Sequence, residues 1–522
     1  MKAGRTLRGP TRRAWLASAA GLLAACREAL RQVTGGWVAD ASVRGHRWRD
    51  RRELPAAAVQ RHCDVLVIGG GVAGLAALRA AVRNGHAEAQ LLEIEPDAGG
   101  NSRGHAIAGI GCPLGAHYLP LPGPEAREVG EWLYEIGLLR HEAGRTVADE
   151  RHLCHAPQER LWVDGAWVDG LLPPADPGSP TMAQYRAFAA AVAQQHGHTL
   201  PAHRAPASAR GAQAALDAMT FSAWLDRRGL VDERLRWYLD YCCRDDYGAG
   251  LHEVSAWAGV HYYASRHGFH APGEAERDGG VFTWPEGNAW LVEHLVRPLR
   301  ERVHTGCAAL RVTAGRHGVQ VLAWNEAASR AEAWTAQTVV LAVPLFVAAR
   351  VVQNPPTALA EAAAATAYAP WLVANLHLDG PLVDRAGAPP SWDNVVYGST
   401  GLGYVDAMHQ SLRPHAGPTV LTVYHALPRS EREALLSDDW RAWLQRVTAP
   451  LLPVHPDLPL RLRHAALARW GHAMAIPVPG LSSQPARQAL RAERGRLRYA
   501  HADLAGYSVF EEAFIAGCEA IG

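Results

Sequence analysis

Three glycines near the start of the chain have the spacing of a nucleotide-binding loop. In VIGGGVAGLAAL, the pattern G-x-G-x-x-G is met by Gly69, Gly71 and Gly74. Gly69 allows a tight turn, Gly71 lets the backbone approach a pyrophosphate, and Gly74 lets the following helix pack closely on the strand. The N-terminus of that helix offers backbone N–H groups and a positive dipole end to phosphates. Such a triplet alone is a weak signal for a nucleotide-binding site, so the interpretation depends on the residues around it.

Those neighbouring residues predict the strand–helix–strand unit that such a loop needs. A short apolar run precedes Gly69, an alanine-rich helical pattern follows Gly74, and AQLLEIE has the composition of a second strand. Glu93 ends this second strand about 20 residues after the loop, where an acid accepts hydrogen bonds from both hydroxyls of an adenosine ribose. An acid here favours an unphosphorylated ribose, so the sequence predicts FAD or NAD rather than NADP.

Two short motifs after Glu93 favour FAD. GGNSRG begins six residues later, and PLGAHYLP follows at 113–120. With these motifs the sequence resembles the flavin-containing amine oxidase superfamily, which includes monoamine and polyamine oxidases and phytoene desaturases. Members place a Gly-Gly-Arg stretch along the pyrophosphate and a Gly-Gly or Gly-Ala turn beside the flavin ring. The matching residues here are Gly99, Gly100, Arg103, Gly115 and Ala116.

The resemblance covers residues 62–522, with one departure. Asn101 stands where the family usually has arginine, which leaves the charge contacts of the pyrophosphate to Arg103 and backbone amides. RVHTGCAAL resembles the strand whose backbone reads adenine and implies a contact at Ala309. The C-terminal segment resembles the family's returning segment: Asp503 would touch the ribityl chain or pyrophosphate, and a helix would begin near Val509 under the isoalloxazine ring. Because NAD enzymes have no reason for such a segment, the resemblance implies FAD.

The patterning and the resemblance together predict an α/β fold in which a Rossmann-like FAD-binding domain is interleaved with a substrate domain of mixed sheet plus a helical insertion. A chain of 522 residues suits two such domains. The expected segments are a signal at 1–26, a linker at 27–61, FAD-binding parts at 62–122, 276–350 and 486–522, a helical cap region at 123–275, and a substrate sheet at 351–485.

The resemblance also implies a reaction, the loss of a hydride equivalent from a C–H next to nitrogen. The catalytic candidates are His117, which family register places beside the flavin ring, and Trp470 and His472, where the family brings a strand to the flavin. Aromatic walls of the substrate space are expected from Trp371, Trp392, Tyr397 and Trp470, which hold a cation or an apolar chain if they do not simply belong to the core.

The segment YCCRDDYGAG admits two interpretations. Arg244, Asp245 and Asp246 either cradle a cationic substrate or pair with one another. Cys242 and Cys243 form either a redox pair or two small buried hydrophobes. The eight cysteines include no C-x-x-C pair and no zinc spacing, so neither a disulfide framework nor a metal site is expected.

Two other functions stay open. One is a flavin-dependent desaturase or isomerase of a lipid or isoprenoid, and the other is an exported FAD-binding redox subunit without its own small-molecule substrate. The sequence has no second dinucleotide loop, so the expected electron acceptor is oxygen, a quinone or a redox protein. Many relatives place a lysine by flavin N5 that assists reoxidation by oxygen, but the only lysine here is Lys2. We therefore expect slow oxidase activity.

The first 26 residues predict export. TRRAWLASAAGLLAAC combines Arg12 and Arg13 with an apolar run too short to span a bilayer, which resembles a signal for the twin-arginine translocase. Leu23 to Cys26 resemble a bacterial lipobox, so Cys26 would carry a lipid anchor on a periplasmic protein. The formal net charge of +1 provides no field for polyanions, and nucleic acid is not an expected partner.

Overall fold

The computed structural model describes residues 32–39, 41–51, 53–274, 280–411, 413 and 415–522. The predicted twin-arginine signal and Cys26 lie outside these residues. Within the described ranges, no helix has both the length and the apolar character that crossing a bilayer requires. The seven cysteines of this part of the chain are all free.

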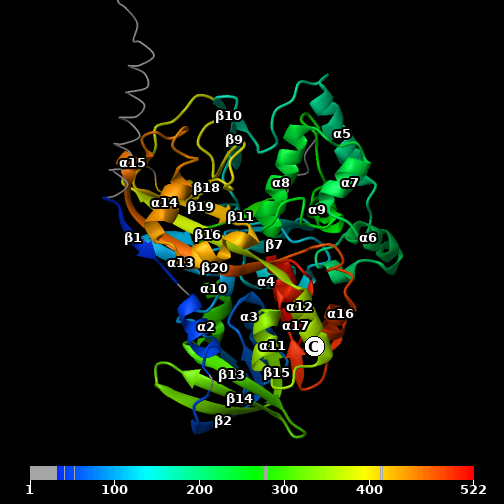
Figure 1. The fold of residues 1–522 in the computed structure, drawn as a ribbon, viewed down its shortest axis with the longest axis vertical. Coiled ribbons are helices and arrows are strands. Elements are labelled where there is room, and N and C mark those ends of the chain that lie inside the picture. The colour runs from blue at the N-terminus through cyan, green and yellow to red at the C-terminus, as the bar shows by residue number, and fades with distance from the viewer. Residues whose placement is uncertain (1–31, 40, 52, 275–279, 412, 414) are drawn as a thin grey trace, which may run out of the picture.

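A seven-stranded sheet forms the lower part of the molecule in Figure 1. Its order is β12-β3-β2-β15-β14-β13, and β21 lies beside the second half of β15. The parallel ends of β2 and β15 are buried, as their apolar runs predict. The bounds are β2 (Ala57–Ile68), β3 (Gln90–Leu92), β12 (Val303–His304), β13 (Cys307–Ala314), β14 (Val319–Asn325), β15 (Arg330–Leu341) and β21 (Leu497–Tyr499).

Helices α3 (Val72–Arg83) and α17 (Phe510–Glu519) pack tightly together in this part of the molecule. A Cβ on Gly517 would overlap the carbonyl oxygen of Ala73, so only glycine permits this approach. The last segment of the chain therefore returns to the first βαβ unit. This arrangement confirms the predicted α/β fold with a Rossmann-like domain.

An eight-stranded sheet lies in the upper left of Figure 1, in the order β1-β20-β16-β19-β18-β17-β9-β10. The central strands β16, β19 and β20 are antiparallel and largely buried. The bounds are β1 (Thr34–Trp37), β9 (Glu159–Val163), β10 (Ala166–Asp169), β16 (Ala367–Leu378), β17 (Asp393–Val396), β18 (Tyr404–Asp406), β19 (Thr419–Ala426) and β20 (Leu462–Ile476).

Two expected segments differ from the structure. Residues 27–61 were expected to be a linker, but β1 pairs in parallel with β20, α2 (Ala41–Arg49) follows, and β2 begins at Ala57. The short strand β1 lacks an apolar alternation because it lies at the sheet edge. Residues 123–275 are not helical throughout, since β9 and β10 complete the eight-stranded sheet and β7 (Leu139–Glu142) pairs with β8 (Arg145–Ala148).

Helices gather at the upper right of Figure 1. They are α5 (Pro180–Ala193), α6 (Arg210–Asp217), α7 (Phe221–Arg227), α8 (Glu233–Tyr247) and α9 (Ala256–Ala264). Side chains accept hydrogen bonds from backbone N–H groups at the starts of α5, α7, α8 and α9, so these helices begin where Ser, Thr or Asp provides a cap.

The remaining elements connect these layers. They are β4 (Gly104–Ile107), β5 (Ile110–Pro113), β6 (Tyr118–Pro120), β11 (Val281–Thr283), α4 (Arg127–Glu135), α10 (Ala289–Val296), α11 (Leu345–Val351), α12 (Thr357–Ala365), α13 (Arg432–Ser437), α14 (Trp440–Thr448), α15 (Leu458–Arg461) and α16 (Pro485–Ala492), with 3₁₀ turns between several of them.

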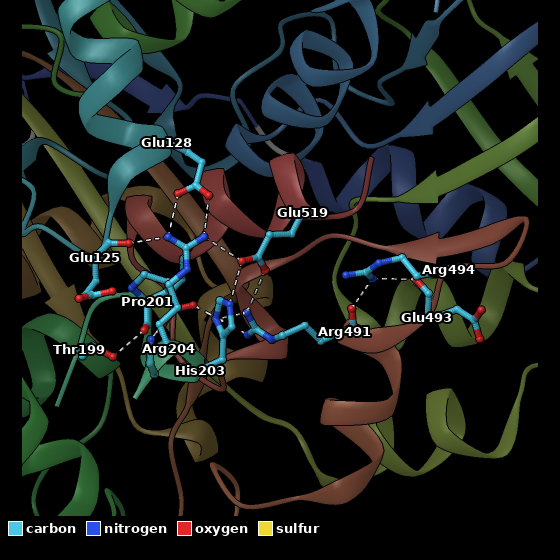
Figure 2. A network of polar contacts seen from close by, with 12 residues as sticks. Glu125, Glu128, Thr199, Pro201, His203, Arg204, Arg491, Glu493, Arg494 and Glu519 are labelled. Atoms are coloured by element: carbon cyan, nitrogen blue, oxygen red, sulfur yellow. Dashed lines mark hydrogen bonds and ion pairs between the residues drawn. The ribbon is translucent and has the colours of Figure 1, made fainter. Parts of the chain in front are cut away.

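A polar network fastens the helical region to the end of the chain (Figure 2). Arg204 donates to both carboxylate oxygens of Glu128 in α4, at 2.9 and 2.6 Å, and to Glu519 in α17 at 2.9 Å. His203 contacts the same oxygen of Glu519 at 2.9 Å. Two segments far apart in sequence, residues 203–204 and α4, are thereby held next to α17, the helix that packs on α3.

Candidate dinucleotide and substrate site

The first glycine loop has the geometry that its sequence requires. Gly69 has φ +105°, a conformation that favours glycine, and a Cβ on it would overlap the carbonyl oxygen of Ala342. A Cβ on Gly74 would overlap the carbonyl oxygen of Gly69, so both positions are sterically fixed as glycine. Gly71 precedes α3 in an extended conformation, and no described side chain caps this helix. Its first N–H groups therefore face the loop.

The second glycine pair lies directly against the first loop. Gly99 donates its N–H to the carbonyl of Gly70 at 2.7 Å, and Gly71 and Gly99 form a β-bridge. A Cβ on Gly71 would meet nothing closer than Gly100 Cα at 3.9 Å, whereas a Cβ on Gly100 would lie 3.1 Å from Gly71 Cα. The two loops form a narrow cradle of bare backbone that fits a pyrophosphate at a helix N-terminus.

Glu93 is buried beside the loop, with 6% of its surface exposed. One carboxylate oxygen accepts the Gly70 N–H at 2.5 Å, and the other accepts the Glu95 N–H at 2.8 Å. Burial raises the pKa of Glu93, and the two backbone hydrogen bonds oppose that rise. Each oxygen still has a lone pair for a ribose hydroxyl.

The predicted adenine strand lies beside Glu93. The backbone of Glu93 hydrogen bonds to His304 and Cys307 on either side of the turn between β12 and β13. Ala309 follows on β13, next to a register shift between Ala309 and Arg311.

Arg103 has a partner that the sequence analysis missed. Its Nη1 donates to Glu95 Oε2 at 3.0 Å, and both side chains are buried. Arg44 donates to the same oxygen at 3.0 Å, and the Arg103 guanidinium lies 5.2 Å from the centre of the Trp470 ring. The Arg103 charge is therefore compensated by Glu95. The sequence signal that could have indicated this partner is EIE, in which a second acid, Glu95, follows two residues after Glu93.

Gly115 and Ala116 lie against the second glycine pair. Ala116 donates its N–H to the carbonyl of Asn101 at 2.8 Å, and a Cβ on Gly115 would overlap that same oxygen. Asn101 donates to the carbonyl of Ala473 in β20 at 2.5 Å. Asn101, at the position of the usual arginine, thus connects the loop to the eight-stranded sheet.

His117 stacks on an aromatic wall. Its ring lies 4.4 Å from that of Tyr424 with 25° between the planes, and 5.5 Å from that of Trp392. Tyr424, which the sequence analysis missed, also donates its hydroxyl to the carbonyl of Gly115 at 3.0 Å. Burial lowers the pKa of His117 to about 3, so this imidazole is neutral at physiological pH.

The other predicted catalytic residues lie in different surroundings. Trp470 pairs with Trp371 across β20 and β16 and donates its indole N–H to the carbonyl of Leu114 at 2.7 Å, which keeps it beside the Gly115 turn. His472 instead contacts the rings of Phe346 and Tyr368, and burial lowers its pKa to about 4.

Tyr397, a predicted wall residue, packs on Trp237, with the ring centroids 4.6 Å apart. It lies at a separate surface pocket beside α8, not against His117. Strand β17 ends at Val396, one residue before Tyr397, and the role of Tyr397 as a wall residue stays a prediction.

The C-terminal candidates hold the returning segment in place. Asp503 Oδ2 accepts the Leu345 N–H at 3.0 Å and the Tyr368 hydroxyl at 2.5 Å, and Oδ1 lies 3.2 Å from His501 Nδ1. Val509 is the N-cap residue of α17, and no described side chain caps that helix. Its free N–H groups are available to an acceptor.

The charge run in α8 divides into paired and unpaired residues. Arg244 donates to Asp240 at 2.9 Å, and Asp246 lies 3.0 Å from Arg266. Asp245 forms no ion pair with a described residue, and burial raises its pKa to about 7, with a further rise from Asp246.

The adjacent cysteines of α8 are both free. Cys242 and Cys243 are buried, and burial raises the pKa of Cys242 to about 12, which disfavours its reactive thiolate form. Across the described ranges, no three His, Cys, Asp or Glu side chains group as metal ligands.

Comparison with known families and structures agrees with this geometry. Residues 67–133 match the model of an NAD(P)-binding Rossmann-like domain. Among curated protein sequences, none matches the chain.

Solved structures share most of the chain's fold. Putrescine oxidase bound to putrescine has 18% identity and a TM-score of 0.66, covering 88% of this chain and 98% of its own. Cyclohexylamine oxidase from Brevibacterium oxydans has 18% identity and a TM-score of 0.64 with the same coverages. A conjugated-linoleic-acid-producing fatty acid isomerase from P. acnes has 15% identity and a TM-score of 0.56, covering 87% and 97%. The chain therefore has the fold of these amine oxidases, with a Rossmann-like domain that fits a dinucleotide cofactor.

Proposed function

We propose that the protein is an FAD-dependent oxidoreductase that removes a hydride equivalent from a C–H next to an amine nitrogen. The loops at Gly71 and Gly100 would hold the pyrophosphate, Glu93 the adenosine ribose, and the start of α17 the isoalloxazine ring. FAD, when bound, supplies the two-electron acceptor. The aromatic residues around His117 would exclude water and orient the substrate.

The observation that favours an amine is Asp245, a carboxylate that burial desolvates and that forms no ion pair with a described residue. Burial raises the pKa of Tyr118 and of Tyr424, and the charge of Asp245 raises both further, which supports a position of Asp245 near the rings that surround His117. A cation is stabilised by such a carboxylate and by aromatic faces. The carboxylate of a fatty acid would be repelled there. This contrast favours amine oxidation over the isomerase alternative suggested by one structural neighbour.

A quinone or a redox protein is the acceptor we favour over oxygen. Lys2 is the only lysine, and it lies outside the described residues. His117 is neutral because burial lowers its pKa to about 3, and Arg103 is paired with Glu95. The described residues near the flavin position therefore provide no uncompensated positive charge from these two groups.

Export and anchoring are part of the proposal. The pair Arg12 and Arg13 would direct a chain already folded around FAD through the twin-arginine translocase, and Cys26 would anchor it at the membrane. An Arg12→Lys, Arg13→Lys double variant should retain the holoprotein in the cytoplasm. Continued export of this variant would contradict the proposal.

The direct test is anaerobic reduction of the purified holoprotein by a panel of amines, amino acids, polyprenoids and an unsaturated fatty acid. Release of FAD on denaturation supports the cofactor assignment, and bleaching of the bound flavin by an amine supports the proposed reaction. Isomerised fatty acid without bleaching by any amine would indicate the isomerase, and bound FAD that no compound reduces would indicate a redox subunit. Folded protein that releases no FAD would refute the cofactor assignment.

A further inference from the structure

The first two elements of the described chain, both blue in Figure 1, form a strap that contacts both large sheets. β1 pairs in parallel with β20 of the eight-stranded sheet, and Gly35 permits this approach, since a Cβ on it would overlap the carbonyl oxygen of Ala465. α2 then lies against the seven-stranded sheet, where Trp48 contacts Trp324 of β14 with 5.3 Å between ring centres. We refer to β1 and α2 as the N-terminal strap.

One side chain of the strap reaches the dinucleotide loops. Arg44 donates to Glu95 Oε2 at 3.0 Å, the oxygen that also accepts a hydrogen bond from Arg103 at 3.0 Å. Arg103 in turn donates to the carbonyl of Gly100 at 3.2 Å. The N–H of Glu95 donates to Glu93 at 2.8 Å. A single carboxylate therefore separates Arg44 from the glycine cradle on one side and from the proposed ribose acid on the other.

The charges at this place favour an anion only when Arg44 is present. Glu93, Glu95 and Arg103 are all buried beside the cradle. When ionised they sum to one negative charge, which opposes the binding of a pyrophosphate. Arg44 reaches the cluster from the surface, with 43% of its side chain exposed, and its guanidinium cancels that excess. The strap thus supplies a charge that the loops themselves lack.

A buried oxygen of the cluster independently indicates a ligand. Glu95 Oε2 accepts hydrogen bonds from both guanidiniums, but Glu95 Oε1 is buried and has no hydrogen-bond partner among the described residues. The carbonyl of Glu95 accepts the Gly306 N–H at 2.8 Å, in the turn that leads to the predicted adenine strand. Because a buried polar atom without a partner is rare in folded proteins, we expect a bound molecule to donate a hydrogen bond to Oε1.

Resting on the function proposed above, we propose that the N-terminal strap is part of the FAD site and that Arg44 binds the adenosine monophosphate (AMP) half of the cofactor. Glu95 Oε1 accepts a hydroxyl of the adenosine ribose beside Glu93, and the Arg44 guanidinium stabilises the negative charge of the phosphate. Binding and docking are linked, so the factor by which Arg44 tightens FAD binding is also the factor by which bound FAD favours the docked strap.

The first test measures the FAD affinity of the full chain by dialysis of the holoprotein against graded FAD concentrations. Arg44→Gln should raise the dissociation constant for FAD about tenfold or more, because it removes a positive charge next to the phosphate. Arg47→Gln is the matched control, since Arg47 lies one turn further along α2 and pairs with exposed Glu326 at 3.1 Å instead. An exposed ion pair contributes little, so this variant should stay within about twofold of the wild type.

The second test follows the strap in the wild-type chain. Hydrogen exchange of the α2 amides should be slower with bound FAD than after the removal of FAD. ADP added to the FAD-free chain should also slow this exchange, because ADP contains the AMP half. FMN contains the flavin and one phosphate but no adenosine, so it should not. In Arg44→Gln, ADP should give the α2 amides no protection.

The outcomes separate this inference from the proposed function. Selective loss of FAD affinity in Arg44→Gln, with protection of α2 by ADP but not by FMN, would support the strap as part of the site. Equal loss in Arg44→Gln and Arg47→Gln, or no loss in either, would overturn the role of Arg44 and leave FAD binding intact. Protection by FMN as strong as that by ADP would also overturn it. A wild-type chain that binds no FAD would refute the proposed function itself.

Discussion

Glu93 and Asp245 are both desolvated carboxylates, yet the chain surrounds them differently. Glu93 accepts backbone N–H groups from Gly70 and Glu95, so the protein stabilises its negative charge before any ligand arrives. Asp245 has no such donor among the described residues; burial raises its pKa, and the charge of Asp246 raises it further. The proposed dinucleotide end of the site is organised by backbone hydrogen bonds, whereas the proposed substrate end would need a bound cation to stabilise its carboxylate.

The largest expected effect concerns the glycine loop. Gly74→Ala should abolish folding or FAD retention, because its Cβ would overlap the carbonyl oxygen of Gly69. Gly71→Ala is the matched variant: its Cβ meets only Gly100 Cα at 3.9 Å, so the chain should fold normally but retain less FAD. Circular dichroism and the FAD released on denaturation measure the two effects. Full FAD content in Gly71→Ala would show that the pyrophosphate does not lie against this residue.

A smaller effect is expected from Glu93, whose carboxylate is held in place by two backbone hydrogen bonds. Glu93→Ala removes an acceptor for the ribose hydroxyls and should weaken FAD binding by about 1 to 3 kcal/mol, the range for a hydrogen bond to a charged group. Equilibrium dialysis of FAD against the variant measures the loss. Glu131→Ala, which changes an exposed acid of α4, is a control that should bind FAD like the wild type. Equal retention in both variants would contradict the assignment of Glu93.

The unpaired acid should lower stability in a pH-dependent way. The pKa of Asp245 is raised to about 7 in the folded chain, so the folded state holds a proton that the unfolded state releases at lower pH. Stability should therefore fall as pH rises from about 4 to about 7. The groups that act on the pKa of Asp245 besides burial are Asp246, Arg244, Arg266 and Glu159.

Asp245→Asn should remove that pH-dependent loss. The variant should be more stable than the wild type at pH 8, on the order of 2 kcal/mol, and nearly equal to it at pH 4. Urea unfolding of the holoprotein at both pH values measures the difference. A variant less stable than the wild type at pH 8 would mean that a partner stabilises the ionised Asp245 carboxylate in the folded protein. Asp245 would then not be free to bind a cationic substrate.

The two ends of the site also differ in how far sequence could predict them. The glycines at 69, 71 and 74 and the acid at 93 are fixed by a contiguous strand–helix–strand unit, whose backbone requirements appear as spacing. His117 was found through the Gly115 turn, but its stacking partner Tyr424 comes from β19, about 300 residues away.

The smallest expected effect is the absence of a histidine step in flavin reoxidation. Burial lowers the pKa of His117 to about 3, far below the usual value near 6.5, so its charge should not change between pH 5 and 8. Stopped-flow reoxidation by oxygen should be slower than reoxidation by a quinone, and its rate should show no transition due to His117 across that range. Asp245 titrates near pH 7, so Asp245→Asn provides the background in which to look. A step near pH 6.5 that persists in this background and disappears when His117→Gln is added would show a protonated His117 beside the flavin. Such a result would mean that His117 carries a positive charge although its ring is buried against Tyr424 and Trp392.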